Sequence, residues 1–438
     1  MEADEQQVNL TRFSLFFPEK RDFFLENQGV FGFGGSGSST ASSTSDTPLL
    51  FYSRRIGLNA GRQIPIRGGG RVTGRSGRYS VGLLNIESGR DPDSATPATH
   101  FTVALVQRDI LRKSTIGAIF TGRSLDPRGG GRNAAYGVDA SLAFYDNLVV
   151  NTYVARTKSD GRAGDDVSYR GQLDYAGDRY GVQIERLSVG SHFSPEVGFV
   201  RRADIRRNFG QVRFSPRPRG SRRIRRYYSM GSVAHIENGA GHLESREVGG
   251  EAAIEFHNAD RFYSGYSNTY EFLPNPFAIA TSVVLPTGGY AFSSGRIGYT
   301  LGQRRRLSGT FAIESGTFYD GNKTSVSWTK GKVNVTPRFS VEPRLSVDRV
   351  RLVEGDFTNR LLGSRATFTV TPLMFVSALV QYNTANHSAS ANVRLRWEYR
   401  PGSEVFVVWN EQRDTLTERF PTLANRAFVV KVNRLLRF

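Results

Sequence analysis

The chain has 438 residues, a formal net charge of +18 and no cysteine. The missing cysteine excludes a disulfide framework, a thiol nucleophile and any cysteine-based metal site. No stretch approaches the roughly 18 uninterrupted apolar residues of a membrane-spanning helix, which excludes a helical membrane protein.

Residues 1–60 differ in kind from the rest of the chain. The stretch from Phe16 to Glu26 is dense in aromatic and charged side chains but lacks the alternation of a strand. Its members are Phe16, Phe17, Pro18, Glu19, Lys20, Arg21, Phe23, Phe24, Leu25 and Glu26. Two interpretations remain open. The segment is a plug whose charges bond to lumen-facing residues, or it is a structural tether to a further domain.

A tract rich in glycine, serine and threonine follows from Gly32 to Thr47 and predicts a flexible loop. It begins with a G-x-G-x-x-G string. A dinucleotide site would need a strand before that string and a helix after it, and neither flank fits. We therefore predict no cofactor here.

From residue 61 to residue 438, short segments alternate apolar and polar residues. Such a period of two predicts strands with one apolar and one polar face. The clearest segments are 136–144, 167–175, 333–349, 365–371 and 389–399. Turn clusters such as Asp320-Gly321-Asn322 separate them. The sequence therefore predicts an all-β fold of roughly twenty strands, between about 18 and 22.

Two architectures fit many alternating strands, a soluble sandwich and a transmembrane barrel. Many segments are longer than the roughly 5–6 residues usual in soluble sheets, and a membrane strand needs about 9–11. Aromatic residues near the predicted strand ends, such as Tyr263, Tyr319 and Trp409, suggest interfacial girdles. We therefore expect a single large antiparallel transmembrane barrel.

Arginines recur on the polar faces of these segments. The predicted lumen arginines are Arg170, Arg338, Arg344, Arg365, Arg394 and Arg396. A barrel of this size leaves a channel or holds a plug. The predicted function is therefore transport, or surface binding of a glycan or anion, with these arginines setting a preference for anions.

The last strand has an apolar face that runs to the final residue. Its members are Phe428, Val430, Val432, Leu436 and Phe438, with Arg434 interrupting them once. A closing aromatic on an alternating strand resembles the assembly signal of bacterial outer-membrane barrels. That resemblance implies the barrel-assembly machinery as a partner and the bacterial outer membrane as the location.

Several strings together resemble one family over essentially the whole chain. They are Asn9–Phe13, Phe16–Arg21, Phe23–Glu26, Tyr52–Gly57, Val72–Arg75, Gln107–Asp109 and Pro195–Phe199. The family is a bacterial outer-membrane β-barrel domain of unknown function. It usually lies C-terminal to a family-9-type carbohydrate-binding domain. One departure is Asp22, where the family usually has proline.

The resemblance also bears on where the chain begins. Met1 is followed by an acidic stretch without the apolar region of a secretory signal. The family has a Glu-Ala-Asp string in mid-chain, and this sequence has it at Glu2, Ala3 and Asp4. We therefore expect Met1 to be an internal position or a mis-assigned start.

No catalytic, cofactor-binding or metal-binding set emerges from the sequence. The six histidines form no H-E-x-x-H motif, and no serine can be matched to a base from sequence order. Enzymatic activity is not expected. The alternatives to transport are a barrel-associated hydrolase and a structural anchor for a missing carbohydrate-binding domain.

The basic charge also limits the choice of partner. Because the arginines recur along strands rather than in one compact patch, nucleic acid is not expected as a partner. The exception is the stretch from Arg217 to Arg226, which suits lipopolysaccharide phosphates or an acidic glycan, or is a solvated turn. The expected partners are outer-membrane lipid, lipopolysaccharide, the barrel-assembly machinery and an anionic glycan or small solute.

Overall fold

The computed structural model describes residues 3–35, 46–59, 62–93, 95–125, 131–161, 163–416 and 421–435. The helical elements are α1 Asp22–Leu25, η1 Gln28–Phe31 and η2 Ser53–Arg55. The strands are β1 Leu58–Asn59, β2 Arg62–Gln63, β3 Ile66–Ser76, β4 Tyr79–Ser88, β5 Thr99–Ile110, β6 Ser114–Arg123, β7 Asn133–Phe144, β8 Leu148–Ser159, β9 Val167–Ala176, β10 Tyr180–Val189, β11 Ile205–Phe214, β12 Ile224–Asn238, β13 Leu243–Phe256, β14 Arg261–Leu273, β15 Phe277–Ala280, β16 Val283–Leu285, β17 Gly288–Leu301, β18 Leu307–Phe318, β19 Gly321–Thr336, β20 Phe339–Leu352, β21 Gly355–Thr371, β22 Met374–Asn383, β23 Ser388–Arg400, β24 Ser403–Asp414 and β25 Thr422–Asn433.

One antiparallel sheet contains 21 of the strands in the described part of the chain. Consecutive strands are neighbours, and the strand order is that of a closed barrel. Two small hairpins, β1–β2 and β15–β16, stand apart from it. The prediction of an all-β antiparallel barrel of roughly twenty strands is confirmed. In the described ranges no helix is long and apolar enough to cross a membrane.

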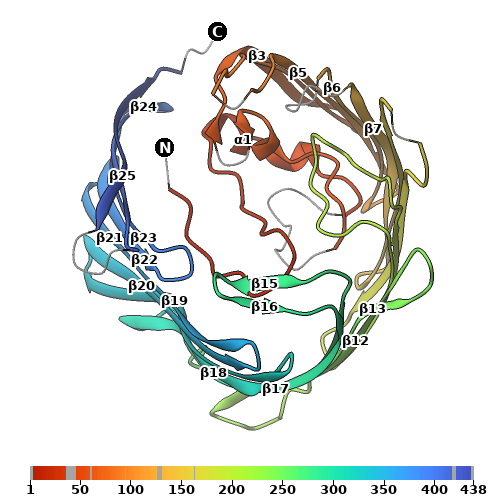
Figure 1. Cartoon of the computed structure of the whole chain (residues 1–438), viewed down its shortest axis with the longest axis vertical. Coiled ribbons are helices and arrows are strands. Elements are labelled where there is room, and N and C mark those ends of the chain that lie inside the picture. The colour runs from red at the N-terminus through yellow and green to blue at the C-terminus, as the bar shows by residue number, and fades with distance from the viewer. Residues whose placement is uncertain are drawn as a thin grey trace. The chain divides into compact units, whose positions relative to one another are not determined.

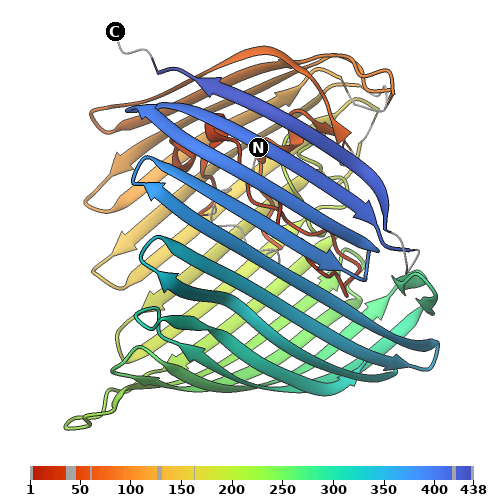
Figure 2. The same ribbon diagram turned by 90° about the vertical axis from the view of Figure 1, so that its left-hand side faces the viewer.

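The chain divides into two compact units. The first unit contains Phe13–Arg213 and Ser232–Arg246. The second unit contains Met1–Arg12, Phe214–Gly231 and Glu247–Phe438. In each unit the strands form a meander in which hairpins join neighbours. Figure 2 shows this for the strands of the second unit drawn in blue.

In the first unit, the two faces of the sheet have opposite environments. Residues paired directly across antiparallel strands point to the same face. One row of such partners passes through Ala118 of β6 and contains apolar residues that are 42–60% exposed: Val81, Val106, Val138, Val154 and Tyr169. A row on the other face is almost fully buried: Leu84, Val103, Thr121, Ala135 and Thr157.

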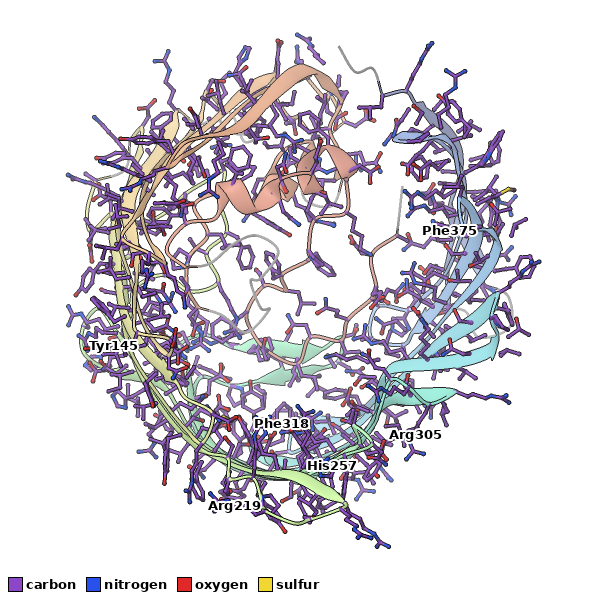
Figure 3. The ribbon with its side chains drawn as sticks, turned by 180° about the vertical axis from the view of Figure 1, so that it is seen from behind. Tyr145, Arg219, His257, Arg305, Phe318 and Phe375 are labelled. Carbon is purple, nitrogen blue, oxygen red and sulfur yellow. The ribbon has the colours of Figure 1, made fainter. Side chains whose placement is uncertain are left out.

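In the second unit, the same alternation separates apolar from polar residues. The exposed apolar row includes Ile297, Ile313 and Val326, which are paired in register. The opposite face carries a polar row of Arg344, Gly363, Gln381, Ser390 and Gln412. Figure 3 shows side chains standing on both faces of the strands.

The prediction of one continuous strand over 333–349 is wrong. The chain reverses at Pro337 and Arg338, between β19 and β20, and Val333 pairs with Val341. Proline fixes its φ angle and donates no hydrogen bond, which favours a turn. The alternation of apolar and polar residues continues through this hairpin because the paired valines share a face, so periodicity alone does not reveal the turn.

The predicted girdle is also corrected at two positions. Tyr263 and Tyr319 are only 6% and 5% exposed and belong to buried clusters. The Tyr319 hydroxyl donates to Glu271 over 3.2 Å. A tyrosine at a strand end is therefore not enough to place its side chain at an interface, because the ring can also be buried in an apolar cluster while its hydroxyl finds a hydrogen-bond partner.

Candidate functional site

The candidate site is the N-terminal segment, residues 13–35 and 46–57, together with the sheet face that it covers in the first unit. Figure 1 shows α1 inside the curve formed by β3, β5, β6 and β7. Phe24, Phe31, Phe33 and Phe51 belong to one buried cluster with residues of these strands, including Val103 of β5. The part of the sheet face under this segment is therefore apolar, unlike the polar face predicted for a lumen.

Two glycines in the strands receive two of these phenylalanines. A Cβ atom at Gly82 would lie 2.8 Å from the Phe31 ring, and one at Gly137 would lie 2.7 Å from the Phe33 ring. Both distances are shorter than a normal carbon–carbon contact, so any residue other than glycine at either position would force the ring or the strand to move. The absence of a side chain at these positions lets the segment approach the sheet backbone closely.

Glu19 is the centre of the hydrogen bonding within the segment. One of its oxygens, Oε1, accepts from the backbone N–H groups of Lys20 and Arg21 at 2.9 and 2.8 Å. The other oxygen accepts from Arg21 Nη2 at 2.7 Å and from the Ser53 hydroxyl at 2.6 Å. Arg21 also donates to the carbonyl oxygens of Ser53 and Ile56. This node ties the first half of the segment to η2.

The pKa of Glu19 is shifted by these contacts. Burial alone would raise the pKa, but the hydrogen bonds from Arg21 and Ser53 and the charge of Arg21 outweigh it and lower the pKa. The carboxylate therefore stays ionised near neutral pH. The node is a charge-assisted hydrogen-bond network with a side-chain exposure of 3% for Glu19.

Three of the strings behind the family resemblance lie together here. Leu49 and Tyr52 donate their backbone N–H groups to the carbonyls of Phe199 and Val197, both at 2.9 Å. The Arg55 guanidinium donates to the Gly198 carbonyl at 3.0 Å. The rings of Phe16, Tyr52 and Phe199 pack with centroids 5.0–5.7 Å apart. In the sequence these strings are far apart, and no pattern in them predicts that they form one assembly.

The remaining members of the Phe16–Glu26 motif lie at the edge of this assembly. The guanidinium of Arg54 lies over the Phe17 ring and donates to the Pro18 carbonyl. Phe23 is 43% exposed, and Leu25 is half-buried. Glu26 accepts a hydrogen bond from Arg71 of β3 at 2.6 Å. The motif therefore makes most of these contacts within the N-terminal segment, and Glu26 links it to a charged residue of the sheet, Arg71.

Arg170 is the predicted lumen arginine of the first unit, and it is buried in ion pairs. Its Nη2 lies 2.6 Å from Glu185, which also contacts Arg207. Its Nη1 donates to the Gly34 carbonyl at 3.0 Å, and the Gly34 N–H donates to Asp139 at 3.0 Å. Arg170 therefore holds the segment rather than facing open solvent. The tract after Gly35, through position 45, lies outside the described residues.

In the second unit, residues 4–12 lie against the polar face. Glu5 forms ion pairs with Arg344 at 3.3 Å and with Arg365 at 3.7 Å. Gln6 hydrogen-bonds to Gln381, Ser388 and Ser390. Arg12 donates to Glu271 at 3.0 Å. The two arginines are thus close together, as partners of one carboxylate.

The other predicted lumen arginines have different surroundings. Arg396 donates through Nε to Glu404 at 2.7 Å. The Arg394 guanidinium lies 4.9 Å from the centre of the Phe406 ring. Arg338 lies in the exposed β19–β20 turn and not in mid-strand. The placement of Arg338 on a strand face is therefore wrong, because the proline before it ends the strand.

The basic stretch from Arg217 to Arg226 forms most of the connection from β11 to β12 and the start of β12. Arg226 pairs with Glu255 at 2.8 Å. The ring of His257 contacts the Ser221 carbonyl at 3.2 Å. Figure 3 shows Arg219 at the outer edge of this region, and its side chain is exposed. The positive charge of the connection is therefore accessible to solvent.

The predicted assembly signal lies partly in the described chain. Phe428, Val430 and Val432 point to one face of β25 and are 55–68% exposed. Leu436 and Phe438 lie outside the described residues. Within the described ranges, no group of three or more histidine, aspartate or glutamate side chains could hold a metal ion.

Comparison with known proteins finds distant likenesses among solved structures. No family model and no curated protein matches the chain. Among solved structures, it is similar to "Copper transporter OprC" at 11% identity and a TM-score of 0.33, covering 84% of this chain and 74% of that one. It is also similar to a "Bacterial polysaccharide outer membrane secretin" at 10% identity and a TM-score of 0.24, covering 81% of this chain and 95% of that one.

A third solved structure is the ferric yersiniabactin uptake receptor FyuA from Yersinia pestis. The identity is 11% and the TM-score 0.26, with 81% of this chain and 60% of that chain covered. All three TM-scores lie below 0.5, so these structures establish neither the activity nor the location of this chain.

Proposed function

We propose that the chain is a bacterial outer-membrane β-barrel that passes or binds anionic solutes at its polar face, with residues 13–35 and 46–57 as a built-in plug. The observation that carries this proposal is the segregation of the two sheet faces. In each unit one face is apolar and exposed. The other face carries arginines, amides and part of the N-terminal segment.

The exposed apolar face supports a membrane location. Soluble monomers rarely expose contiguous apolar patches beyond a few hundred Å², whereas lipid-facing strands alternate apolar outward and polar inward. The rows run across neighbouring strands, from Val81 to Tyr169 in the first unit and from Ile297 to Val326 in the second. Main-sheet strands of 10–17 residues are also long enough to span a bilayer.

Heat-modifiability on a gel tests the membrane proposal. The full chain is refolded into detergent micelles, and heated and unheated samples are compared. We expect a compact band that shifts on boiling, because a closed barrel resists detergent until it is heated. A chain that dissolves in plain buffer and shows no shift would contradict the membrane proposal.

Conductance across a planar bilayer tests the proposed solute preference. Arg344 and Arg365 share Glu5 as a partner, so Glu5→Gln removes the negative charge that these two cations share. An ion about 4 Å from one unit charge in water gains about 1 kcal/mol. We therefore expect up to about a fivefold rise in the chloride-to-potassium permeability ratio, measured from reversal potentials in a salt gradient.

The matched control for Glu5→Gln is Asp146→Asn. Asp146 is an exposed turn residue paired with Lys113, with 88% of its side chain accessible, so this change alters net charge equally. Its reversal potential should equal that of the unmodified chain. Cation selectivity in the Glu5→Gln variant would overturn the anion preference.

We also propose that the barrel-assembly machinery recognises the apolar face of β25. We further propose that anionic glycans are one class of solute that the chain binds. The arginine side chains near Glu5 could pair with carboxylate or sulfate groups on such a glycan through charge-assisted hydrogen bonds.

A further inference from the structure

The apolar face of the first unit contains a groove of about 550 Å³. Its floor includes two glycines, Gly171 of β9 and Gly210 of β11. A Cβ atom at Gly171 would meet nothing within 4 Å, and one at Gly210 would meet only Val233 at 3.7 Å. The groove exists because the sheet has no side chain at either of these two glycine positions.

The walls of the groove are aliphatic. They are formed by Val150, Leu173, Ile184 and Val233. Ile184 is 59% exposed and Val233 is 45% exposed. The volume lies within the roughly 300–1,000 Å³ of ligand-binding pockets. An apolar chain laid in this groove would cover surface that is otherwise open.

Polar side chains stand toward one end of the same groove. The Arg186 guanidinium donates to the Asn208 side-chain oxygen at 2.6 Å. His235 contacts Glu237 at 3.0 Å. Arg206 lies two residues before Asn208 and so on the same face of β11. The groove therefore combines an apolar floor and walls with a guanidinium that has a neutral amide as its hydrogen-bond acceptor.

The polar end lies toward the long connections of the first unit. Arg186 is near the end of β10, which leads into residues 190–204, and His235 is near the end of β12. Most connections at the other end of the strands of this unit are shorter, such as 145–147 and 177–179, and the connection 215–223 between β11 and β12 is the exception. In outer-membrane barrels the long connections face outward and the short turns face the periplasm.

We propose that this groove binds a phosphorylated acyl glycolipid of the outer leaflet, the lipid A part of lipopolysaccharide. One acyl chain lies over Gly171 and Gly210, and a phosphate meets Arg186. Arginine binds phosphate through paired N–H donors, and a cation on a lipid-facing strand is destabilising unless it is near an interface. This inference rests on the membrane location proposed above.

Native mass spectrometry of the full chain refolded in detergent tests the inference. The probes are diphosphorylated lipid A, the same lipid without phosphates, phosphatidylglycerol and inorganic phosphate. Gly171→Phe fills the floor of the groove, and Arg186→Gln removes the cation. We expect each to weaken lipid A binding roughly ten- to hundredfold. Gly74→Phe is the control, because a Cβ there also meets nothing within 4 Å and Gly74 pairs with the exposed Val81 of the same face.

The outcomes separate this inference from the membrane proposal. A chain that is heat-modifiable but binds lipid A no better than phosphatidylglycerol would overturn the lipid A site and leave the membrane location standing. Binding displaced equally by inorganic phosphate would show an anion site without a lipid. Equal loss in the Gly74→Phe control would show a general effect of bulky residues on the lipid-facing surface, and would also overturn the groove.

Discussion

Glu19→Ala should release the N-terminal segment from the first unit. The substitution leaves the Arg21 guanidinium without its carboxylate, with the carbonyls of Ser53 and Ile56 as hydrogen-bond acceptors. It also removes the acceptor for the Ser53 hydroxyl and for two backbone N–H groups. Breaking a buried ion pair costs about 3–5 kcal/mol. Hydrogen exchange of the amides that fix the segment, such as those of Leu49 and Tyr52, should accelerate by about 10² to 10³-fold or more.

Glu26→Gln is the matched control for this experiment. It removes a carboxylate from the same segment, but the Glu26 side chain is 72% exposed. An exposed ion pair contributes only about 0–1 kcal/mol, so the exchange rates should change little. Equal acceleration in both variants would show that any loss of charge loosens the segment, and would contradict the central role of Glu19.

The same node predicts a pH dependence. The folded state lowers the pKa of Glu19 below its ordinary value of 4.5. The stabilisation is therefore fully present above pH 4.5 and is lost as the pH falls through the lowered pKa. Bilayer conductance of the unmodified chain should rise at acid pH if the segment limits conduction, whereas Glu19→Gln should flatten that dependence. An unchanged pH profile in the variant would assign the titration to another group.

The sequence predicts the sheet well because the signal is local. Alternation reports which face each residue occupies, and it identifies segments such as 136–144 within β7 and 389–399 within β23. The same local signal cannot detect a tight hairpin that preserves face parity. Alternation alone therefore does not distinguish the turn at Pro337 and Arg338 from a continuous strand.

The candidate site is less predictable because its contacts are long-range. The motif around Glu19 is visible in the sequence, but its partners at Ser53 and Ile56 are more than thirty positions away. The contacts of Leu49 and Tyr52 with Val197 and Phe199 span a greater distance along the chain. No periodicity connects such segments. The ion pairs are equally hard to predict. Glu5 and Arg344 are 339 positions apart in the sequence and come together only in the folded chain.

Gly137→Val should displace the segment by steric clash rather than by loss of charge. A Cβ at this position would lie 2.7 Å from the Phe33 ring and 3.0 Å from the Ala155 Cβ. Overpacking of this kind costs about 1–3 kcal/mol. The Gly34 amide, which donates to Asp139, should lose exchange protection, and bilayer conductance should rise.

A second substitution distinguishes the clash from a general weakening of β7. Phe33→Ala removes the ring that the valine would meet, so the double variant should be less destabilised than the sum of the two single variants. Gly74→Val serves as the control, since a Cβ there meets nothing within 4 Å and points to the apolar face. Additive effects of Gly137→Val and Phe33→Ala would mean that the glycine matters to the strand alone. A favourable coupling between Gly137→Val and Phe33→Ala would instead show that Gly137 provides the space for the Phe33 ring. Phe33 can contact the sheet at that point only because Gly137 has no side chain.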